Sequence, residues 1–447
     1  MKNRTIAAVS TPHGVGGISV IRVSGCDSIS ICDSIYKGKK SLKSVKSHTV
    51  CYGHIVDKNG VPADEVLVTV MHAPKTYTRE DVVEISTHGG FSASKKVLEL
   101  LISAGAYPAE AGEFTKRAFL NGRIDLSQAE GVIDIINSKT DAERQNALYQ
   151  AGGGLFKKIK KLRDSLVHLA AEMQVAIDYP DEDLEDVTKD DIVKTLSECE
   201  NEVNRLIATK DNGRILKEGI KTAIVGKPNV GKSSLLNCLS GGDRAIVTDI
   251  PGTTRDVIEE FVNLDGVPLR LLDTAGIRDT DDDVEKIGVE RAKAAIADAE
   301  LVIFVMDESA DPDDTDALLF RLIKDKKIIT VANKSDIKKV DLDADVEISA
   351  KDGNGIAELA KIIKNMYNFA EIEANDNTVI TNLRHLAALE RAKEAVSRAK
   401  EQIFAGMPQD IAALDINEAI DRLGEITGET VSDDIVSEIF HSFCVGK

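Results

Sequence analysis

The chain reads Gly226-Lys227-Pro228-Asn229-Val230-Gly231-Lys232-Ser233-Ser234 directly after the apolar run 222–225. This is the pattern G-x-x-x-x-G-K-S, which is typical of a phosphate-binding loop between a strand and a helix. The glycines let backbone N–H groups turn toward a polyphosphate, Lys232 can reach the β- and γ-phosphates, and the Ser233 hydroxyl can ligate Mg²⁺. A chance glycine-rich turn is the alternative interpretation, and the motifs downstream argue against it.

Two later motifs indicate which nucleotide is bound. Asn333-Lys334-Ser335-Asp336 follows the apolar run 328–332. The Asp336 carboxylate can accept hydrogen bonds from the ring N–H and the exocyclic amine of guanine, whereas adenine would leave the carboxylate buried and unpaired. Ser349-Ala350-Lys351, after another apolar run, can add a backbone N–H to the guanine oxygen. The sequence therefore favours GTP over ATP.

A fourth motif concerns hydrolysis. Asp273-Thr274-Ala275-Gly276 ends an apolar run, which places a carboxylate for Mg²⁺ and a glycine N–H for the γ-phosphate. The next residue, where many GTPases carry a glutamine that orients the attacking water, is Ile277. An apolar side chain cannot orient water, so another group must. Nearby carboxylates are those of Asp279, Asp281, Asp282, Asp283 and Glu285, although most of them fit a solvated loop equally well.

Length and composition suggest several domains in one chain. The 447 residues exceed one ordinary core and suggest about three units. The net charge of −19 argues against nonspecific nucleic-acid binding by the whole surface. Six cysteines without paired spacing suggest neither a disulfide scaffold nor a zinc site, and no apolar run approaches the length of a membrane span. We expect a soluble cytoplasmic protein.

Hydrophobic periodicity divides the chain. Strands are expected at 6–10, 18–23, 65–71 and 82–86 and a helix at 92–104, which predicts an N-terminal α/β or α+β domain. Helical stripes follow from 114 to 208 and resume after 375, with a break at Gly406 to Pro408 and another at the acidic run 178–186. Two basic runs, at 37–46 and 157–163, are interpreted as solvated, with RNA contact as the alternative.

The predicted members of the helical stripes share three- and four-residue spacing. They are Ala129, Val132, Ile133, Ile136; Leu155, Ile159, Leu162, Leu166, Leu169, Met173, Ile177; Ile192, Leu196, Cys199, Val203, Leu206; Leu383, Leu386, Leu389, Val396, Ala399, Ile403; and Ile411, Leu414, Ile420, Leu423. We expect these side chains to form a bundle core.

Between the two helical blocks the pattern alternates strand and helix. Strands are expected at 221–225, 257–264, 269–273, 301–306, 327–332 and 346–348, an order that predicts a doubly wound sheet. A compact domain with neighbouring termini can be inserted into another. We therefore expect one helical bundle interrupted by the nucleotide domain, with two separate helical domains as the alternative.

Several motifs together resemble one family. They are the loop 226–229, the segment 248–256 (Thr-Asp-Ile-Pro-Gly-Thr-Thr-Arg-Asp), Asp273 to Gly276, Thr11-Pro12-His13-Gly14, Ala118-Phe119-Leu120-Asn121 and the terminal Phe443-Cys444-Val445-Gly446-Lys447. The chain resembles the tRNA uridine-5-carboxymethylaminomethyl modification GTPases (MnmE/TrmE) over essentially its whole length. The resemblance implies four segments: an N-terminal tetrahydrofolate-binding-like α+β and dimerisation domain at 1–117, helical segments at 118–215 and 373–447, and a Ras-like GTPase domain at 216–372.

The resemblance also assigns roles around the nucleotide. Asn229, Thr248, Ile250 and Thr253 match a K⁺ site, Ser233 and Thr254 match Mg²⁺ ligands, and Glu285 matches a glutamate that orients the attacking water through a bridging water. A cation beside the β- and γ-phosphates can neutralise developing charge. The full set of expected nucleotide-binding residues is Asn229, Val230, Gly231, Lys232, Ser233, Ser234, Thr248, Asp249, Ile250, Pro251, Gly252, Thr253, Thr254, Asp273, Thr274, Ala275, Gly276, Asn333, Lys334, Ser335, Asp336, Ser349, Ala350 and Lys351.

A second site is implied in the N-terminal domain. Family positions for 5-formyl- or 5,10-methylene-tetrahydrofolate fall on Arg22, Glu84, Arg123 and Lys447, and relatives often have lysine at the third. Arg22 and Glu84 could, from the residues alone, equally be a surface ion pair. Cys444 is either a buried small hydrophobe or a reactive thiol, and the resemblance favours the second. Lys232, Glu285 and Cys444 are the expected catalytic residues.

The implied function is a K⁺-stimulated, homodimeric GTPase. With a flavin-dependent MnmG-type partner, in a heterotetramer, it would add a carboxymethylaminomethyl or aminomethyl group to carbon 5 of the wobble uridine of certain tRNAs. The alternative is a GTP-gated ribosome-assembly factor that binds ribosomal RNA. That function predicts a basic RNA-binding module beside the nucleotide domain, and the C-terminal block has no G-x-x-G loop and mixes acidic with basic residues. A dimerising scaffold is a third possibility.

Overall fold

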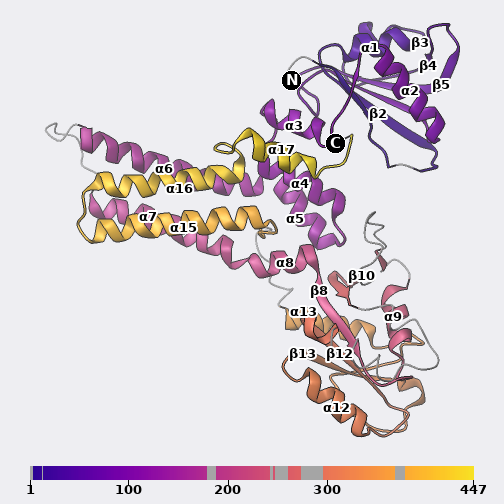
Figure 1. The fold of residues 1–447 in the computed structure, drawn as a ribbon, viewed down its shortest axis with the longest axis vertical. Coiled ribbons are helices and arrows are strands. Elements are labelled where there is room, and N and C mark those ends of the chain that lie inside the picture. The colour runs from indigo at the N-terminus through magenta and orange to yellow at the C-terminus, as the bar shows by residue number, and fades with distance from the viewer. Residues whose placement is uncertain are drawn as a thin grey trace. The chain divides into compact units, whose positions relative to one another are not determined.

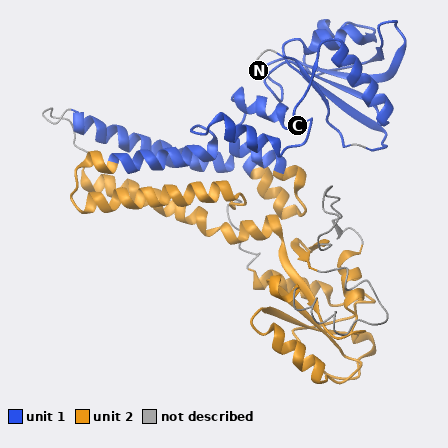
Figure 2. Cartoon of the chain, viewed as in Figure 1, with its two compact units in different colours: residues 1–133, 150–183, 413–447 blue, residues 134–149, 184–412 orange. Residues whose placement is uncertain are grey.

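The computed structural model describes residues 4–12, 14–178, 188–241, 245–246, 260–272, 295–367 and 378–446. The chain forms two compact units, one of residues 1–133, 150–183 and 413–447 and the other of residues 134–149 and 184–412 (Figure 2). Among the described residues, no helix is long and apolar enough to cross a membrane.

The N-terminal domain is built on a seven-stranded sheet in the order β3-β4-β5-β6-β2-β1-β7. Its elements are β1 (Ile6–Val9), β2 (Ile18–Ser24), α1 (Ser28–Ile35), β3 (Tyr36–Gly38), β4 (Thr49–Val56), β5 (Pro62–Met71), β6 (Val82–His88), α2 (Phe91–Ser103) and β7 (Tyr107–Pro108) (Figure 1). Alternate residues of β2 and β5 are buried, and they share one core with α1 and α2. The expected α+β class is confirmed, although α1, β3, β4 and β7 had not been predicted.

Helices make up the next part of the chain and its end. They are α3 (Glu113–Leu120), α4 (Leu126–Asn137), α5 (Asp141–Ala151), α6 (Gly154–Asp178), α7 (Lys189–Ala208), α8 (Lys210–Glu218), α15 (Leu383–Phe404), α16 (Gln409–Thr427) and α17 (Asp433–His441). In one unit α7 packs along α15, and Lys400 pairs with Glu200 at 2.8 Å (Figure 1). In the other, Arg163 of α6 pairs with Glu429 after α16 at 2.6 Å. Within each unit, helices from before and after the nucleotide domain therefore pack together, and the helical part is interrupted by the nucleotide domain as expected.

Most of the predicted helical stripes are buried. The α7 stripe is buried throughout, and so are Leu155 to Met173 of α6. The prediction was wrong for Ile136, Ile177, Leu383, Ile411 and Leu414, which are exposed. Ile136, Ile177 and Leu383 lie in the first or last turn of their helices. In α16 the neighbouring Ala412 and Ala413 are buried in place of Ile411 and Leu414, so the packed face of that helix differs from the predicted one.

The inserted domain is built on a second seven-stranded sheet, in the order β14-β13-β12-β8-β11-β10-β9. Strands β8 (Ile220–Val225), β11 (Val267–Leu271), β12 (Leu301–Asp307), β13 (Lys327–Asn333) and β14 (Val346–Ile348) are parallel, and β9 (Ala245–Ile246) and β10 (Glu260–Leu264) extend the β11 edge antiparallel. Its described helices include α9 (Lys232–Ser240), α12 (Asp314–Ile323) and α13 (Ile356–Met366).

Both faces of this sheet are covered. Ile303 and Val305 of β12 pack with α9 and α13, while Val302 and Phe304, which point the other way, pack with α12. This is the doubly wound arrangement that the sequence predicted. The carboxyl ends of parallel strands then meet at one edge, where ligands bind in such sheets.

Candidate nucleotide-binding site

The phosphate loop joins β8 to α9. Asn229 and Gly231 have positive φ values of 64° and 96°, and Gly231 is the residue that caps α9. A Cβ on Gly226 would lie 2.3 Å from the Val305 carbonyl oxygen, and one on Gly231 would lie 2.1 Å from Nδ2 of Asn333. Gly226 is thus required by the close approach of β12, and Gly231 is required both by the neighbouring Asn333 amide and by its positive φ.

Lys232 lies inside this loop. Its ammonium donates hydrogen bonds to the carbonyl oxygens of Gly226 and Lys227, at 2.8 Å and 2.6 Å. Burial lowers the pKa of Lys232. Ser233, half-buried, is the second residue of α9. An ammonium and a hydroxyl at a helix N-terminus are suited to a polyphosphate with its Mg²⁺.

Asn333 fastens three loops together. Its side chain is buried, its Nδ2 donates to the Val230 carbonyl at 2.8 Å, and its Oδ1 accepts from the Ala350 N–H at 3.0 Å. The phosphate loop, the Asn333–Asp336 loop and the Ser349–Lys351 loop are therefore held by one amide. Sequence reasoning had assigned Asn333 to guanine recognition and had missed this role.

The predicted guanine-reading carboxylate lies at the mouth of this arrangement. Asp336 is exposed in the 3-10 turn η2 (Ser335–Ile337), and its Oδ1 accepts from the Ser349 hydroxyl at 3.2 Å. Lys334 has a φ of 68° and pairs with Asp307, at the end of β12, at 2.5 Å. The structure thus brings the residues of both motifs to the edge occupied by the phosphate loop.

One further contact to the phosphate loop was not predicted. Lys227 pairs with Asp316 at 2.6 Å and Asp313 at 3.0 Å, at the start of α12. The hydrogen bond that the Lys227 ammonium donates to Asp316 is the main cause that raises the pKa of Lys227. Asp313 and Asp316 lie far from Lys227 in the sequence. The one available signal was that β8 and β12 are parallel, so the segments that follow them meet at the same edge of the sheet.

Several predicted nucleotide-site residues lie outside the described residues. They are Thr248, Asp249, Ile250, Pro251, Gly252, Thr253, Thr254, Asp273, Thr274, Ala275, Gly276 and Glu285, together with Ile277. Their roles at K⁺, Mg²⁺ and the attacking water stay predictions.

A second cluster in the N-terminal domain contains the predicted folate residues. Arg22 and Glu84 are register partners on β2 and β6, and their side chains form an ion pair at 2.8 Å. The Arg22 guanidinium lies 5.3 Å from the ring centroid of Tyr77, and that of Arg123 lies 4.8 Å from the same ring. Arg22 and Arg123 thus contact the same aromatic ring and Glu84 pairs with Arg22, whereas Lys447 lies outside the described residues.

The C-terminal tail reaches this cluster. Val445 forms an isolated antiparallel β-bridge with Ala111. The Gly446 carbonyl oxygen accepts hydrogen bonds from the Ser10 hydroxyl at 3.0 Å and from the Arg22 guanidinium at 3.5 Å. Cys444 is an exposed free thiol, so the alternative of a buried hydrophobe is wrong. The tail therefore lies beside the predicted folate residues, with its thiol accessible.

Two family models match the chain. One, described as the MnmE helical domain, matches residues 126–444, and the other, described as the GTP-binding protein TrmE N-terminus, matches residues 5–123. A tRNA modification GTPase MnmE of Acetivibrio thermocellus is 48% identical over 100% of both chains. This chain belongs to the MnmE family. A second MnmE, of Thermoanaerobacter sp. strain X514, is 49% identical over 99% of both chains.

The inserted domain of this MnmE family member is also similar to a solved structure. Era of Aquifex aeolicus, bound to GDP and AlF4⁻, matches 39% of this chain and 65% of its own at 30% identity, with a TM-score of 0.25. The doubly wound fold follows from the strand order of the second sheet.

Proposed function

We propose that this chain is a GTPase that acts in the modification of tRNA. The observation that carries the proposal is the 48% identity, over the full length of both chains, with a relative named as a tRNA modification GTPase. The site supports it chemically: a phosphate loop, an ammonium and an exposed carboxylate at Asp336 lie at one sheet edge. Asp336 accepts from guanine, which gives the preference for GTP.

Two cations complete the proposed nucleotide site. Ser233 and Thr254 would hold Mg²⁺, and Asn229, Thr248, Ile250 and Thr253 would supply neutral oxygens to K⁺. Of these, Asn229 lies exposed in the phosphate loop with a φ of 64°, a backbone conformation that asparagine tolerates. The cations supply positive charge where negative charge develops during phosphoryl transfer. Lys232 binds the phosphates and Glu285 orients the attacking water.

The potassium site is tested by GTP turnover of the purified chain in K⁺ and in Na⁺. The proposal expects faster turnover in K⁺ and loss of that difference in Asn229→Ala, with nucleotide still bound. Equal turnover in both ions, or an unchanged Asn229→Ala protein, would remove the potassium assignment.

The N-terminal domain is proposed to bind 5-formyl- or 5,10-methylene-tetrahydrofolate through Arg22, Glu84, Arg123 and Lys447. Its donor set fits such a ligand: guanidinium groups suit the ligand's carboxylates, Glu84 can accept N–H bonds, and Tyr77 offers an aromatic face. The folate would supply a one-carbon unit, and the exposed Cys444 is the proposed thiol of the modification chemistry. The proposed domain boundaries are 1–117, 118–215, 216–372 and 373–447.

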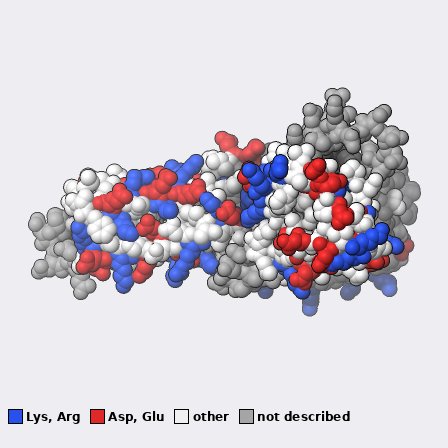
Figure 3. All heavy atoms as spheres, turned by 90° about the horizontal axis from the view of Figure 1, so that it is seen from below, with Lys and Arg blue, Asp and Glu red and all other residues white. Residues whose placement is uncertain are grey.

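The proposed partners are a second copy of this chain, a flavin-dependent MnmG-type protein in a heterotetramer, and tRNA. Charges of both signs are interspersed on the face drawn in Figure 3, so tRNA contact is expected to be local.

The function is tested by mass analysis of tRNA nucleosides from cells that lack this chain. Wobble uridines without their carbon-5 substituent would support it. Normal tRNA together with accumulated ribosome precursors would instead indicate a ribosome-assembly factor.

A further inference from the structure

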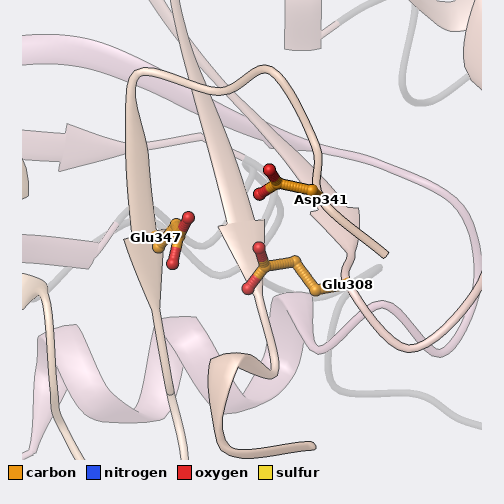
Figure 4. A group of neighbouring side chains, drawn as sticks. All are labelled: Glu308, Asp341 and Glu347. Carbon is orange, nitrogen blue, oxygen red and sulfur yellow. The ribbon is translucent and has the colours of Figure 1, made fainter. Parts of the chain in front are cut away.

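A lysine ammonium lies among three carboxylates beside the guanine-reading loops. The carboxylates are those of Glu308, which follows β12, Asp341, and Glu347 of β14 (Figure 4), and one oxygen of each lies within 4.8 Å of the others. Nζ of Lys338 lies 3.2 Å, 2.9 Å and 2.8 Å from them, respectively. The arrangement resembles a metal site, but the cation that these carboxylates surround is the Lys338 ammonium.

Glu308 makes this lysine hard to replace. The Glu308 side chain is fully buried, and neither of its carboxylate oxygens has a hydrogen-bond partner of good geometry among the described residues. Among the described residues, the Lys338 ammonium is the positive charge that pairs with the Glu308 carboxylate. A buried carboxylate that loses its counter-charge is strongly unfavourable. The hydrogen bonds that the Lys338 ammonium donates to Glu347 and then to Asp341 raise the pKa of Lys338.

The backbone of Glu308 holds both ends of the loop that carries Asp336. Its N–H donates to the Asn333 carbonyl at 3.0 Å, and its carbonyl accepts from the N–H groups of Lys339 and Val340 at 2.8 Å and 3.0 Å. Lys338 follows directly after the turn η2, which contains Asp336. The ion pair between Lys338 and Glu308 therefore fastens this loop by a side chain as well.

Lys338 also reaches the second guanine-facing loop. Glu347, its partner at 2.8 Å, lies on β14 two residues before Ser349. At the mouth of the site the Ser349 hydroxyl donates to Asp336 at 3.2 Å. The Asn333–Asp336 loop and the Ser349–Lys351 loop are thus joined twice, by the hydrogen bond between Ser349 and Asp336 and by the ion pair between Lys338 and Glu347.

We propose that Lys338 is a positioning residue for guanine recognition. Through Glu308 and Glu347 it fixes Asp336 relative to the Ser349–Lys351 loop, and so sets the preference for guanine over a base that lacks the exocyclic amine. This inference rests on the proposed use of GTP.

The test compares GTP with ITP, whose base lacks the exocyclic amine that Asp336 reads. Lys338→Met is expected to raise KM for GTP about tenfold, the effect of weakening a hydrogen bond to a charged group, with a smaller effect on KM for ITP and on kcat. The matched control is Lys361→Met. Lys361 pairs with Glu358 on the surface of α13 at 2.9 Å, so its loss should leave the GTP-to-ITP preference unchanged.

A second variant separates positioning from stability. Lys338→Met combined with Glu308→Gln removes the buried charge but does not restore the side-chain link that Lys338 makes between the two loops. We expect it to recover the Tm that Lys338→Met loses and to keep the reduced GTP-to-ITP preference. A wild-type preference in this double variant would overturn the inference. Failure of the wild-type chain to hydrolyse GTP would instead count against the proposed function.

Discussion

At the scale of single residues, the specificity of the nucleotide site rests on Asp336. Its carboxylate is exposed at the mouth of the site, where it is held by the Ser349 hydroxyl. A carboxylate accepts two N–H bonds from guanine, whereas a carboxamide would present a donor to the same edge. The identity of this one side chain should therefore decide which base is bound.

We predict that Asp336→Asn lowers the affinity for GTP by at least about 100-fold, because a donor then faces the guanine amine. The same variant should gain affinity for XTP, whose base has a carbonyl in place of that amine. Binding of fluorescent nucleotides measures both, and Asp343→Asn, a change at a neighbouring exposed carboxylate, is the control. Unchanged GTP affinity would show that the base is read elsewhere.

Glu143 provides a prediction about pH. Burial is the main cause that raises the pKa of Glu143 to about 6, although its Oε2 accepts a bond from the Lys139 N–H at 2.7 Å. Because the folded-state pKa lies above the ordinary value of 4.5, the stabilising effect of protonated Glu143 is complete below pH 4.5 and is lost as pH rises through about 6.

Glu143→Gln should therefore flatten the dependence of Tm on pH between about 4.5 and 6 and raise Tm at pH 7, since the amide is always neutral and can still accept from Lys139. Glu358→Gln, at an exposed position of α13, is the control. Parallel pH profiles for the wild type and Glu143→Gln would contradict the assignment.

At the scale of elements, helical periodicity predicts the packed middle of a helix better than its ends. The α7 stripe is buried along its whole length, but Leu383, the first residue of α15, is 76% exposed although it continues the same period. Helix α1 had not been predicted, because its sequence Ser-Ile-Ser-Ile alternates like a strand and becomes helical where it packs on the sheet.

This contrast gives a stability prediction. Leu196→Ala should destabilise the bundle by about 2–5 kcal/mol, because it opens a cavity between α7 and α15. Leu383→Ala should change the free energy of unfolding by less than about 0.5 kcal/mol. Urea unfolding followed by circular dichroism measures both free energies of unfolding. Equal destabilisation by the two substitutions would contradict the exposed position of Leu383.

The docked tail is a second element whose position can be tested. Gly446 has a φ of 95°, and a Cβ there would lie 2.5 Å from the Val9 carbonyl oxygen. We predict that Gly446→Ala costs about 1–3 kcal/mol of local stability and releases the tail, which faster hydrogen exchange in residues 443–446 would report. Gly14→Ala, where a Cβ meets nothing within 4 Å, should leave exchange unchanged. Full protection in Gly446→Ala would contradict the docking.

At the scale of the whole molecule, the sequence predicts contiguous motifs but does not predict contacts between residues that are far apart in the chain. The phosphate loop and Asn333–Asp336 are contiguous motifs, so their chemistry and their sheet edge could be predicted. The ion pairs of Lys227 with Asp316 and of Lys338 with Glu308 join residues far apart in the chain, and their charges have no sequence pattern that marks them as partners. Only the folded sheet brings them together.

We propose that GTP bound at this site drives tRNA modification. Its most direct test is mass analysis of wobble uridines in cells that lack the chain and are supplied with either the wild type or Asp336→Asn at equal level. The wild type is expected to restore the carbon-5 substituent, and Asp336→Asn is expected not to restore it. Full restoration by Asp336→Asn would contradict it.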